Sequence, residues 1–156
     1  MSGPETRVVA WDEVVRFRIP ADWAIDTEEH EGKPVLALRP PGGRGVLRLV
    51  ADVIPAKDSP VYTLREVALR FVRPDDGRAS DRVLEDRPGG GIIATAVMVT
   101  DEDGRRETHY LWLAGVEAAA SVRVAMFSFA TPAEHDGTLG DLLAPLDDAI
   151  RAAEIL

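Results

Sequence analysis

Apolar and polar positions divide residues 91–130 into three segments of strand length, and two turn signals separate these segments. The first turn signal, Asp101–Gly104, ends in an Asp-Gly pair, which adopts positive φ angles at little steric cost. The second, Ala114–Glu117, places a glycine between two apolar runs. This spacing is typical of antiparallel strands joined by short connections. The stretch therefore predicts a three-stranded antiparallel meander on which the rest of the chain packs.

The chain outside this meander shows the same alternation in shorter segments. In the clearest one, Val15, Phe17 and Ile19 alternate with Arg16 and Arg18, as in a half-buried strand that ends at a proline. Strands are predicted at residues 14–20, 24–28, 35–38, 46–54 and 82–87. Hairpin-connected strands of this kind form an antiparallel sheet.

Two segments change to the spacing of a helix. The first begins at Thr63, because Thr63 and Glu66 form a capping box, and it ends before Pro74. The second closes the chain, and Pro145 within it is expected to kink or restart the helix because proline lacks an N–H. A helical turn is also expected at residues 131–134. The apolar face of the last helix consists of Leu139, Leu142, Leu143, Leu146, Ile150 and Ala153.

Together these elements predict an α+β fold. We expect an α/β/α sandwich around a twisted antiparallel sheet, with a C-terminal amphipathic helix packed on that sheet. Residues 1–12 are expected to be a frayed N-terminal segment, and residues 13–156 a single domain. At 156 residues the chain is long enough to bury a core without a disulfide or a metal ion.

Composition narrows the classes of partner and compartment. The net charge of −9 disfavours nonspecific binding to nucleic acid or to anionic membranes. The chain has no cysteine, which removes disulfides, thiolate catalysis and cysteine-containing zinc sites. Neither a signal peptide nor a membrane-spanning run is visible in the sequence, so we expect a cytoplasmic protein. The abundance of arginine, alanine and aspartate fits a GC-rich bacterial genome.

The residue types that carry chemistry do not form a catalytic or metal-binding motif. His30, His109 and His135 lack the spacing of zinc ligands, and Glu134–Asp136 supplies adjacent residues that point in different directions on a helix. None of the serines lies in a G-x-S-x-G sequence. We therefore expect no catalytic residue, no metal and no cofactor, and a hydrogen-bonded structural role for His109.

The segment Phe17–Trp23 (FRIPADW), together with Phe127–Phe129 before the leucine-rich helix and the order of elements, resembles the PsbP-like superfamily. That superfamily includes PsbP, Ran-binding Mog, DcrB and type VI secretion adaptor proteins. The resemblance implies an α/β/α sandwich around an antiparallel sheet and a non-catalytic domain that binds a protein partner. It carries over no binding residue by position. Within the matching segment, Trp23 is expected to be a core residue.

The site hypothesis rests on aromatic and charged residues that interrupt apolar strands. Tyr110 and Trp112 are expected to line a concave face of the sheet with Arg48, Asp52 and Arg123, because aromatic and arginine side chains dominate recognition surfaces. Our first hypothesis is an adaptor-like or chaperone-like module that offers this face to a protein or peptide.

Two alternatives remain open. The domain could be an enzyme or a small-molecule or lipid binder whose ligand lies between sheet and helix, which requires an enclosed pocket of about 300 Å³ or more. It could also be a self-associating structural subunit, for example a homodimer. An open groove or a large exposed apolar patch would instead favour the adaptor hypothesis.

Overall fold

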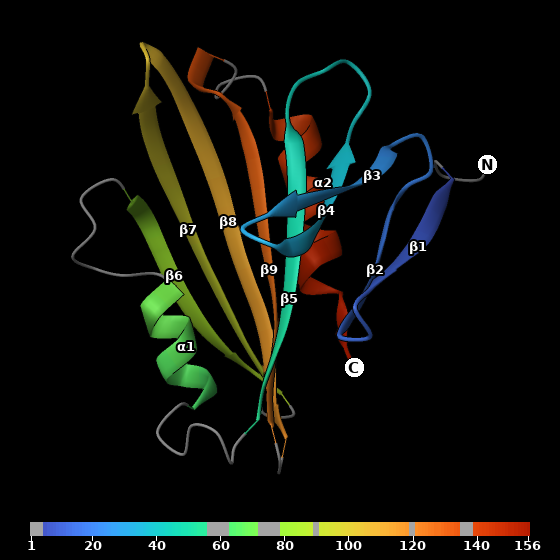
Figure 1. Cartoon of the computed structure of the whole chain (residues 1–156), viewed down its shortest axis with the longest axis vertical. Coiled ribbons are helices and arrows are strands. Elements are labelled where there is room, and N and C mark those ends of the chain that lie inside the picture. The colour runs from blue at the N-terminus through green and yellow to red at the C-terminus, as the bar shows by residue number, and fades with distance from the viewer. Residues whose placement is uncertain (1–4, 56–62, 72–78, 89–90, 119–120, 135–138) are drawn as a thin grey trace.

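The computed structural model describes residues 5–55, 63–71, 79–88, 91–118, 121–134 and 139–156. Within these ranges the chain forms ten strands and two helices (Figure 1). The elements are β1 (Thr6–Trp11), β2 (Val15–Pro20), β3 (Ala24–His30), β4 (Lys33–Arg39), β5 (Val46–Pro55), α1 (Leu64–Phe71), β6 (Ala79–Arg87), β7 (Gly91–Glu102), β8 (Arg105–Ala118), β9 (Ser121–Pro132), α2 (Gly140–Arg151) and β10 (Glu154–Ile155).

The described strands divide into two sheets. The large sheet has the order β3-β4-β5-β9-β8-β7-β6, and the small sheet has the order β1-β2-β10. Every neighbouring pair in both sheets is antiparallel. The predicted meander is present as β7, β8 and β9 (Figure 1). The predicted α+β fold with an antiparallel sheet is confirmed.

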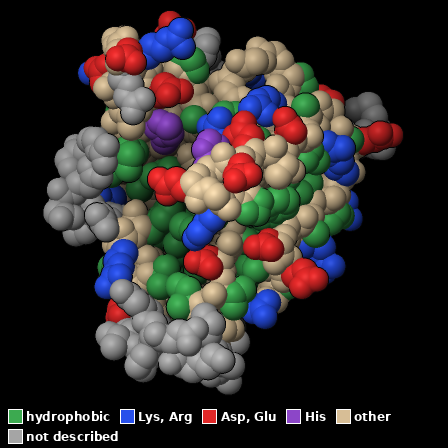
Figure 2. Space-filling view, viewed as in Figure 1, with side chains coloured by type: hydrophobic (Ala, Val, Ile, Leu, Met, Phe, Trp, Pro, Cys, Tyr) green, Lys and Arg blue, Asp and Glu red, His purple; other side chains and the backbone are tan. Residues whose placement is uncertain are grey.

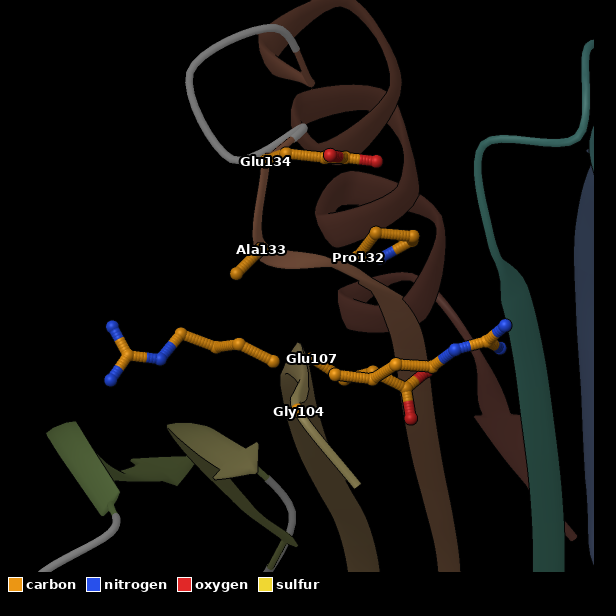
Figure 3. Close-up of a pocket in the computed structure, with 7 residues that line it drawn as sticks. Gly104, Glu107, Pro132, Ala133 and Glu134 are labelled. Carbon is orange, nitrogen blue, oxygen red and sulfur yellow. The ribbon is translucent and has the colours of Figure 1, made fainter. Parts of the chain in front are cut away.

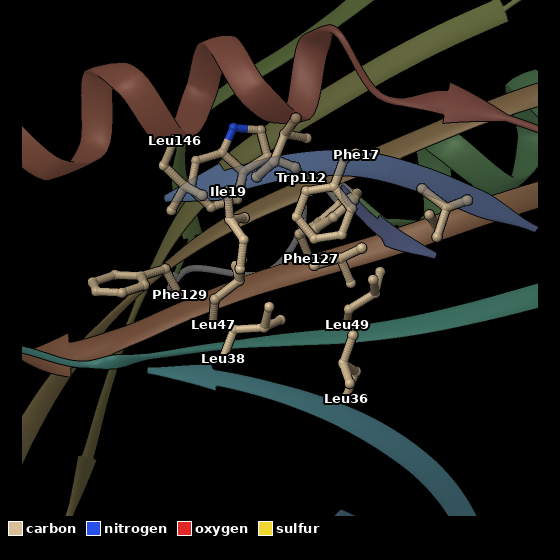
Figure 4. Packing of buried hydrophobic residues seen from close by; sticks show 14 of the residues in the cluster. Phe17, Ile19, Leu36, Leu38, Leu47, Leu49, Trp112, Phe127, Phe129 and Leu146 are labelled. Atoms are coloured by element: carbon tan, nitrogen blue, oxygen red, sulfur yellow. The ribbon is translucent and has the colours of Figure 1, made fainter. Parts of the chain in front are cut away.

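One face of the large sheet, the α2 face, is covered by α2 and by β2 of the small sheet. Phe17 of β2 meets Phe127 of β9 edge to face, with ring centroids 5.3 Å apart and the rings at 86°, a favourable arrangement for two aromatic rings. Figure 4 shows Leu146 of α2, Ile19 of β2 and Leu47 of β5 meeting in the same cluster. Trp23 is also buried there, at 6% exposure, as expected. The leucines of α2 therefore cover the sheet as the sequence predicted.

The opposite face, the α1 face, carries the second core. Leu64 and Ala68 of α1 pack with Leu113 of β8 and Val124 of β9. At the start of α1, the Thr63 hydroxyl accepts the N–H of Glu66 at 3.2 Å, which confirms this half of the predicted capping box. A helix on each face of the large sheet gives the predicted sandwich (Figure 1).

The predicted frayed segment is wrong for residues 6–11. These residues form β1 and pair with β2 along its length, from Thr6 opposite Pro20 to Trp11 opposite Val15. Val9 is buried in the core, at 6% exposure, so burial of one apolar side chain outweighs the polar composition on which the prediction rested. Residues 1–4 lie outside the described part of the chain.

The first predicted turn of the meander is confirmed and the second is wrong. Asp103 and Gly104 have φ angles of 52° and 76°, as the Asp-Gly signal requires. Gly115 instead lies inside β8, and β8 continues to Ala118. A Cβ atom on Gly115 would lie 2.6 Å from Cδ1 of Leu64, so this glycine lets α1 pack closely on the sheet.

The beginning of the last helix also differs from the prediction. Residues 131 and 132 belong to β9, so the helical turn predicted at residues 131–134 is wrong there and is confirmed at residues 133–134, which are 3₁₀-helical. The helix α2 itself begins at Gly140. Pro145 lies within α2, which continues without a restart because buried leucines on both sides of Pro145 hold it on the sheet. No helix in the described ranges combines the length and the apolar character needed to cross a bilayer.

Candidate functional site

The structure does not bring the five predicted site residues onto one surface. Strand register places Tyr110, Trp112 and Arg123 on the α2 face of the large sheet, and Arg48 and Asp52 on the α1 face. Side chains alternate along a strand, so the face of each residue follows from its position in its own strand. The predicted joint surface is therefore not formed.

Trp112 lies in the core rather than on a surface. Its side chain is 5% exposed, and its indole Nε1 donates a hydrogen bond of 2.9 Å to Asp147 of α2. Tyr110 is half-buried beside it, and both residues line a small hollow of about 190 Å³ next to Asp147. Tyr110 and Trp112 are therefore neighbours, and the hydrogen bond from Trp112 to Asp147 holds α2 on the sheet.

Arg48 belongs to a charge cluster on the α1 face, centred on Glu28. Arg48 and Arg39 each donate a hydrogen bond of 2.9 Å to the carboxylate of Glu28, and Nε2 of His30 lies 3.1 Å from it. The hydrogen bonds from Arg48, His30 and Arg39 lower the pKa of Glu28 from 4.5 to about 2. The ion pairs of Glu28 with Arg39 and Arg48 therefore link β3 to β4 and β5.

Asp52 and Arg123 also have partners within the chain. Oδ1 of Asp52 accepts the backbone N–H of Val53 at 2.9 Å, in a part of β5 beyond its pairing with β4. Arg123 donates to the main-chain oxygen of Leu156 at 3.0 Å. The Asp52 contact is local, and the Arg123 contact joins β9 to residue 156.

The two described histidines lie in separate places. His30 belongs to the Glu28 cluster, and Nε2 of His109 lies 3.1 Å from the hydroxyl of Thr100, in agreement with the expected hydrogen-bonded role. His135 is outside the described residues. No group of three or more potential metal ligands occurs among the residues that the structure describes.

The α1 face carries an apolar strip beyond the reach of α1. Figure 2 shows hydrophobic side chains gathered in a hollowed part of this face, bordered by acidic and basic side chains. Its half-buried members lie on the central strands and include Val50, Met98, Leu111 and Met126. This strip contains none of the five predicted site residues, so it is not the recognition face that the sequence predicted.

A different hollow lies at the tip of the β7–β8 hairpin. It has a volume of about 740 Å³, and Figure 3 shows Gly104 and Glu107 on one side and Pro132, Ala133 and Glu134 on the other. None of its lining residues is buried. Without a buried apolar floor it offers little area for binding.

The better-formed site is a groove between β2 and α2, which we call the β2–α2 groove. Its first half is a hollow of about 440 Å³ that is open to solvent. Buried apolar side chains form its floor, and four prolines stand around it. The floor consists of Ile19, Trp23, Leu142 and Leu146, and the prolines are Pro20, Pro40, Pro41 and Pro145.

The second half of the groove is a hollow of about 460 Å³ further along the same seam. Arg18 of β2 and Ala149 of α2 line both halves, so the two hollows meet at these residues. Val8 also lines the second half, although its side chain is 48% exposed. The groove is thus more apolar in its first half and more polar in its second.

Paired charges stand at both ends of the groove. Arg44 donates two hydrogen bonds to Asp141, at 3.1 and 3.2 Å, and these contacts lower the pKa of Asp141. At the other end Arg16 forms an ion pair with Glu154. The charges at the two ends of the groove are therefore neutralised in pairs.

Two charges in the groove remain unpaired within the described residues. The one side-chain hydrogen bond of Arg18 to another described residue goes to the Thr6 hydroxyl, at 3.4 Å, and neither Arg18 nor Asp22 has an oppositely charged partner there. The β2–α2 groove therefore combines an apolar floor with one free cation and one free anion. Such a combination of apolar surface and a few polar groups is typical of binding sites.

A groove between β2 and α2 was not predicted from the sequence. The segment Phe17–Trp23 was singled out for its resemblance to a family, and Trp23 was expected in the core. A usable signal was the alternation of Arg16 and Arg18 on the outward face of β2. That α2 lies beside this strand could not be read from the sequence.

The fold and groove define the class of molecule: an α+β domain with a helix on each face of an antiparallel sheet and a groove beside the C-terminal helix. No family model matches the sequence, and no curated protein matches it. Among solved structures, LpqN of Mycobacterium tuberculosis, described as involved in cell envelope biogenesis, is similar with a TM-score of 0.61 and 13% identity over 97% of this chain and 90% of LpqN.

A crystal structure from Bacteroides thetaiotaomicron VPI-5482 is similar as well. Its TM-score is 0.54 with 21% identity over 91% of this chain. The match covers 45% of the Bacteroides chain, so the present chain spans less than half of that protein's length. At identities this low, the structural likeness shows a shared fold alone.

Proposed function

We propose that this domain is a non-catalytic module that binds a protein or peptide partner in the β2–α2 groove. The observation that carries the proposal is the meeting of an apolar, proline-flanked floor with the unpaired charges of Arg18 and Asp22. Unpaired charges beside a buried apolar floor contribute little to folding, and they provide specificity toward a ligand.

We further propose that the chain is a PsbP-like protein. The segment Phe17–Trp23, which carries part of the resemblance, contributes Ile19 and Trp23 to the floor of the groove and Pro20 to its edge. The overall likeness to LpqN is compatible with this assignment. Under it, the resemblance supports a protein partner rather than a substrate.

The length of the groove suits an extended peptide. Its helical wall runs from Asp141 to Ala152, a distance of about 16 Å at 1.5 Å per residue. An extended chain covers about 3.3 Å per residue, so about five residues fit along it. A peptide needs to bury only one side in such an open groove.

A small amphipathic molecule is the second candidate, favoured by the volume of the first hollow. At about 440 Å³ this hollow exceeds the size that we set for a ligand pocket. An alkyl chain could lie on Leu142 and Leu146 with an anionic head group at Arg18. The open side of the hollow would leave much of such a chain in water, which favours the peptide.

The net charge of −9 supports a partner other than nucleic acid or an anionic membrane. The cytoplasm remains our proposed location. The cell-envelope role belongs to LpqN, and fractionation of the native cells, with immunodetection of this chain, tests whether the present protein shares that location.

The experiment that tests the proposed function blocks the groove. Ala149 is half-buried where the two hollows meet, so Ala149→Arg places a long charged side chain across the groove. Leu69→Arg on the exposed surface of α1 is the matched helix variant. A partner isolated on the immobilised domain is purified, and its affinity for each variant is measured by calorimetry.

We expect Ala149→Arg to weaken binding at least tenfold and Leu69→Arg to leave it unchanged. Equal binding of the purified partner to both variants would remove the groove as the site. Laurate is titrated in parallel, and a laurate affinity that only Ala149→Arg reduces, with no effect of either variant on the protein partner, would select the small-molecule candidate.

A further inference from the structure

The unpaired arginine in the middle of the groove indicates which chemical group its occupant carries. Resting on the proposed function, we infer that the β2–α2 groove binds an extended peptide segment whose acidic side chain pairs with Arg18 and whose neighbouring residues are apolar. The inference depends on the position of Arg18, on the pairing of the charges around it, and on the open shape of the groove.

Arg18 is placed where the two hollows meet, so an occupant that extends through both hollows lies beside it. Its neighbours in β2, Phe17 and Ile19, are buried in the core, which turns the Arg18 side chain outward. It lines both hollows together with Ala149. A guanidinium with five donors is well suited to bind a carboxylate through two hydrogen bonds.

Few groups of this chain compete with a ligand for the guanidinium of Arg18. The other two arginines of the groove are held by Asp141 and Glu154, and the contact of Arg18 with the Thr6 hydroxyl is 3.4 Å long. A carboxylate from a partner therefore gains the ion pair without breaking one. The apolar floor of the first half receives the residue next to that carboxylate.

The overall charge of the domain limits how acidic the partner segment can be. With a net charge of −9, the domain repels strongly acidic chains at a distance. Asp22, unpaired at the proline-flanked end, offers a place for a basic side chain. A segment with one acidic group, one basic group and apolar residues between them complements the groove.

The experiment selects peptides without assuming their sequence. A phage-displayed library of random 12-residue peptides is panned against the wild-type domain, against Arg18→Glu and against Arg65→Glu. Arg65 is an exposed arginine of α1 that pairs with Asp86, far from the groove in sequence and on the other face of the large sheet. All three proteins are first shown to have the same far-UV spectrum.

We expect the wild type and Arg65→Glu to enrich peptides with Asp or Glu between apolar residues, and Arg18→Glu to enrich Lys or Arg at that position. For the best peptide, fluorescence anisotropy should show at least a tenfold weaker affinity for Arg18→Gln. Replacing the peptide's acidic residue by its amide should give a similar loss, and combining the two changes should add little.

The outcomes separate this inference from the proposed function. Peptides that lose binding to Ala149→Arg but bind Arg18→Gln normally would overturn the role of Arg18 and leave the peptide groove in place. Failure to enrich any peptide that is sensitive to Ala149→Arg would overturn both. Enrichment of the same acidic peptides by the wild type and by Arg18→Glu would also overturn the role of Arg18.

Discussion

The indole Nε1 of Trp112 donates a hydrogen bond of 2.9 Å to Oδ1 of Asp147. The other oxygen of Asp147 accepts a hydrogen bond from Nε of Arg151, and Arg151 in turn donates to Glu85, each at 2.9 Å. The hydrogen bonds to Asp147 and Glu85 raise the pKa of Arg151 against the effect of burial. This chain of contacts joins β8, α2 and β6, and so fixes the helix that forms one wall of the proposed groove.

We predict that Trp112→Phe lowers the free energy of unfolding by about 1–2 kcal/mol, because it removes the hydrogen bond and leaves Asp147 with one partner fewer. Trp112→Ala should cost about 3–5 kcal/mol, since it also leaves a cavity. Urea denaturation followed by circular dichroism measures both. Trp112→Ala with an unchanged midpoint would contradict the buried position of Trp112.

The Glu28 cluster predicts a specific dependence of stability on pH. The pKa of Glu28 is about 2 in the folded chain, against an ordinary value of 4.5. The stabilisation from this carboxylate is therefore fully present above pH 4.5 and is lost as the pH falls from 4.5 toward 2. The melting temperature of the wild type should fall more steeply in this window than that of Glu28→Gln. Parallel curves for the two proteins would show that the cluster does not hold Glu28 ionised.

Gly45 is a position where even a methyl group should be destabilising. A Cβ atom there would lie 2.6 Å from the carbonyl oxygen of Ala130 and 2.6 Å from the ring of Phe129. We expect Gly45→Ala to cost about 1–3 kcal/mol, the usual range for overpacking. Gly140→Ala is the matched control, because an added Cβ there meets nothing within 4 Å apart from its chain neighbours and its own helix backbone. Thermal unfolding should separate the two, and similar melting temperatures would argue against the close packing at Gly45.

The start of α1 is held from two sides. The Thr63 hydroxyl accepts the N–H of Glu66, and Oε2 of Glu117 on β8 accepts the N–H of Leu64 at 3.1 Å. Thr63→Ala and Glu117→Ala should each cost about 1 kcal/mol. Hydrogen exchange at the amides of Leu64 and Glu66 measures the two contacts separately, and protection that survives both substitutions would rule out this capping.

The spacing of apolar residues predicted most of the fold, because a strand with one buried face must alternate apolar and polar side chains. The outward Arg16 and Arg18 against the buried Val15, Phe17 and Ile19 are enough to define β2. The errors arose at residues whose role depends on a contact with a residue far away in the sequence. Gly115 makes room for Leu64, a contact between residues far apart in the sequence, and as a lone glycine it resembled a turn.

The candidate site was less predictable for a geometric reason. The sequence shows that Arg48 and Tyr110 interrupt apolar strands, and it does not show which strands become neighbours or in what register. Register places Arg48 opposite Ser128 and Tyr110 opposite Phe129, on different faces of the large sheet. The groove depends on the same kind of information, because β2 and α2 meet only in the folded chain.

The position of β10 beside β2 has a consequence for how the protein is made. Glu154 pairs with Arg16, and Ile155 with Val15, so the strand that carries Arg18 gains its second neighbour only after residues 154 and 155 have left the ribosome. The large sheet can form from residues that emerge earlier. The proposed groove can therefore be completed only after the residues of the large sheet have been synthesised.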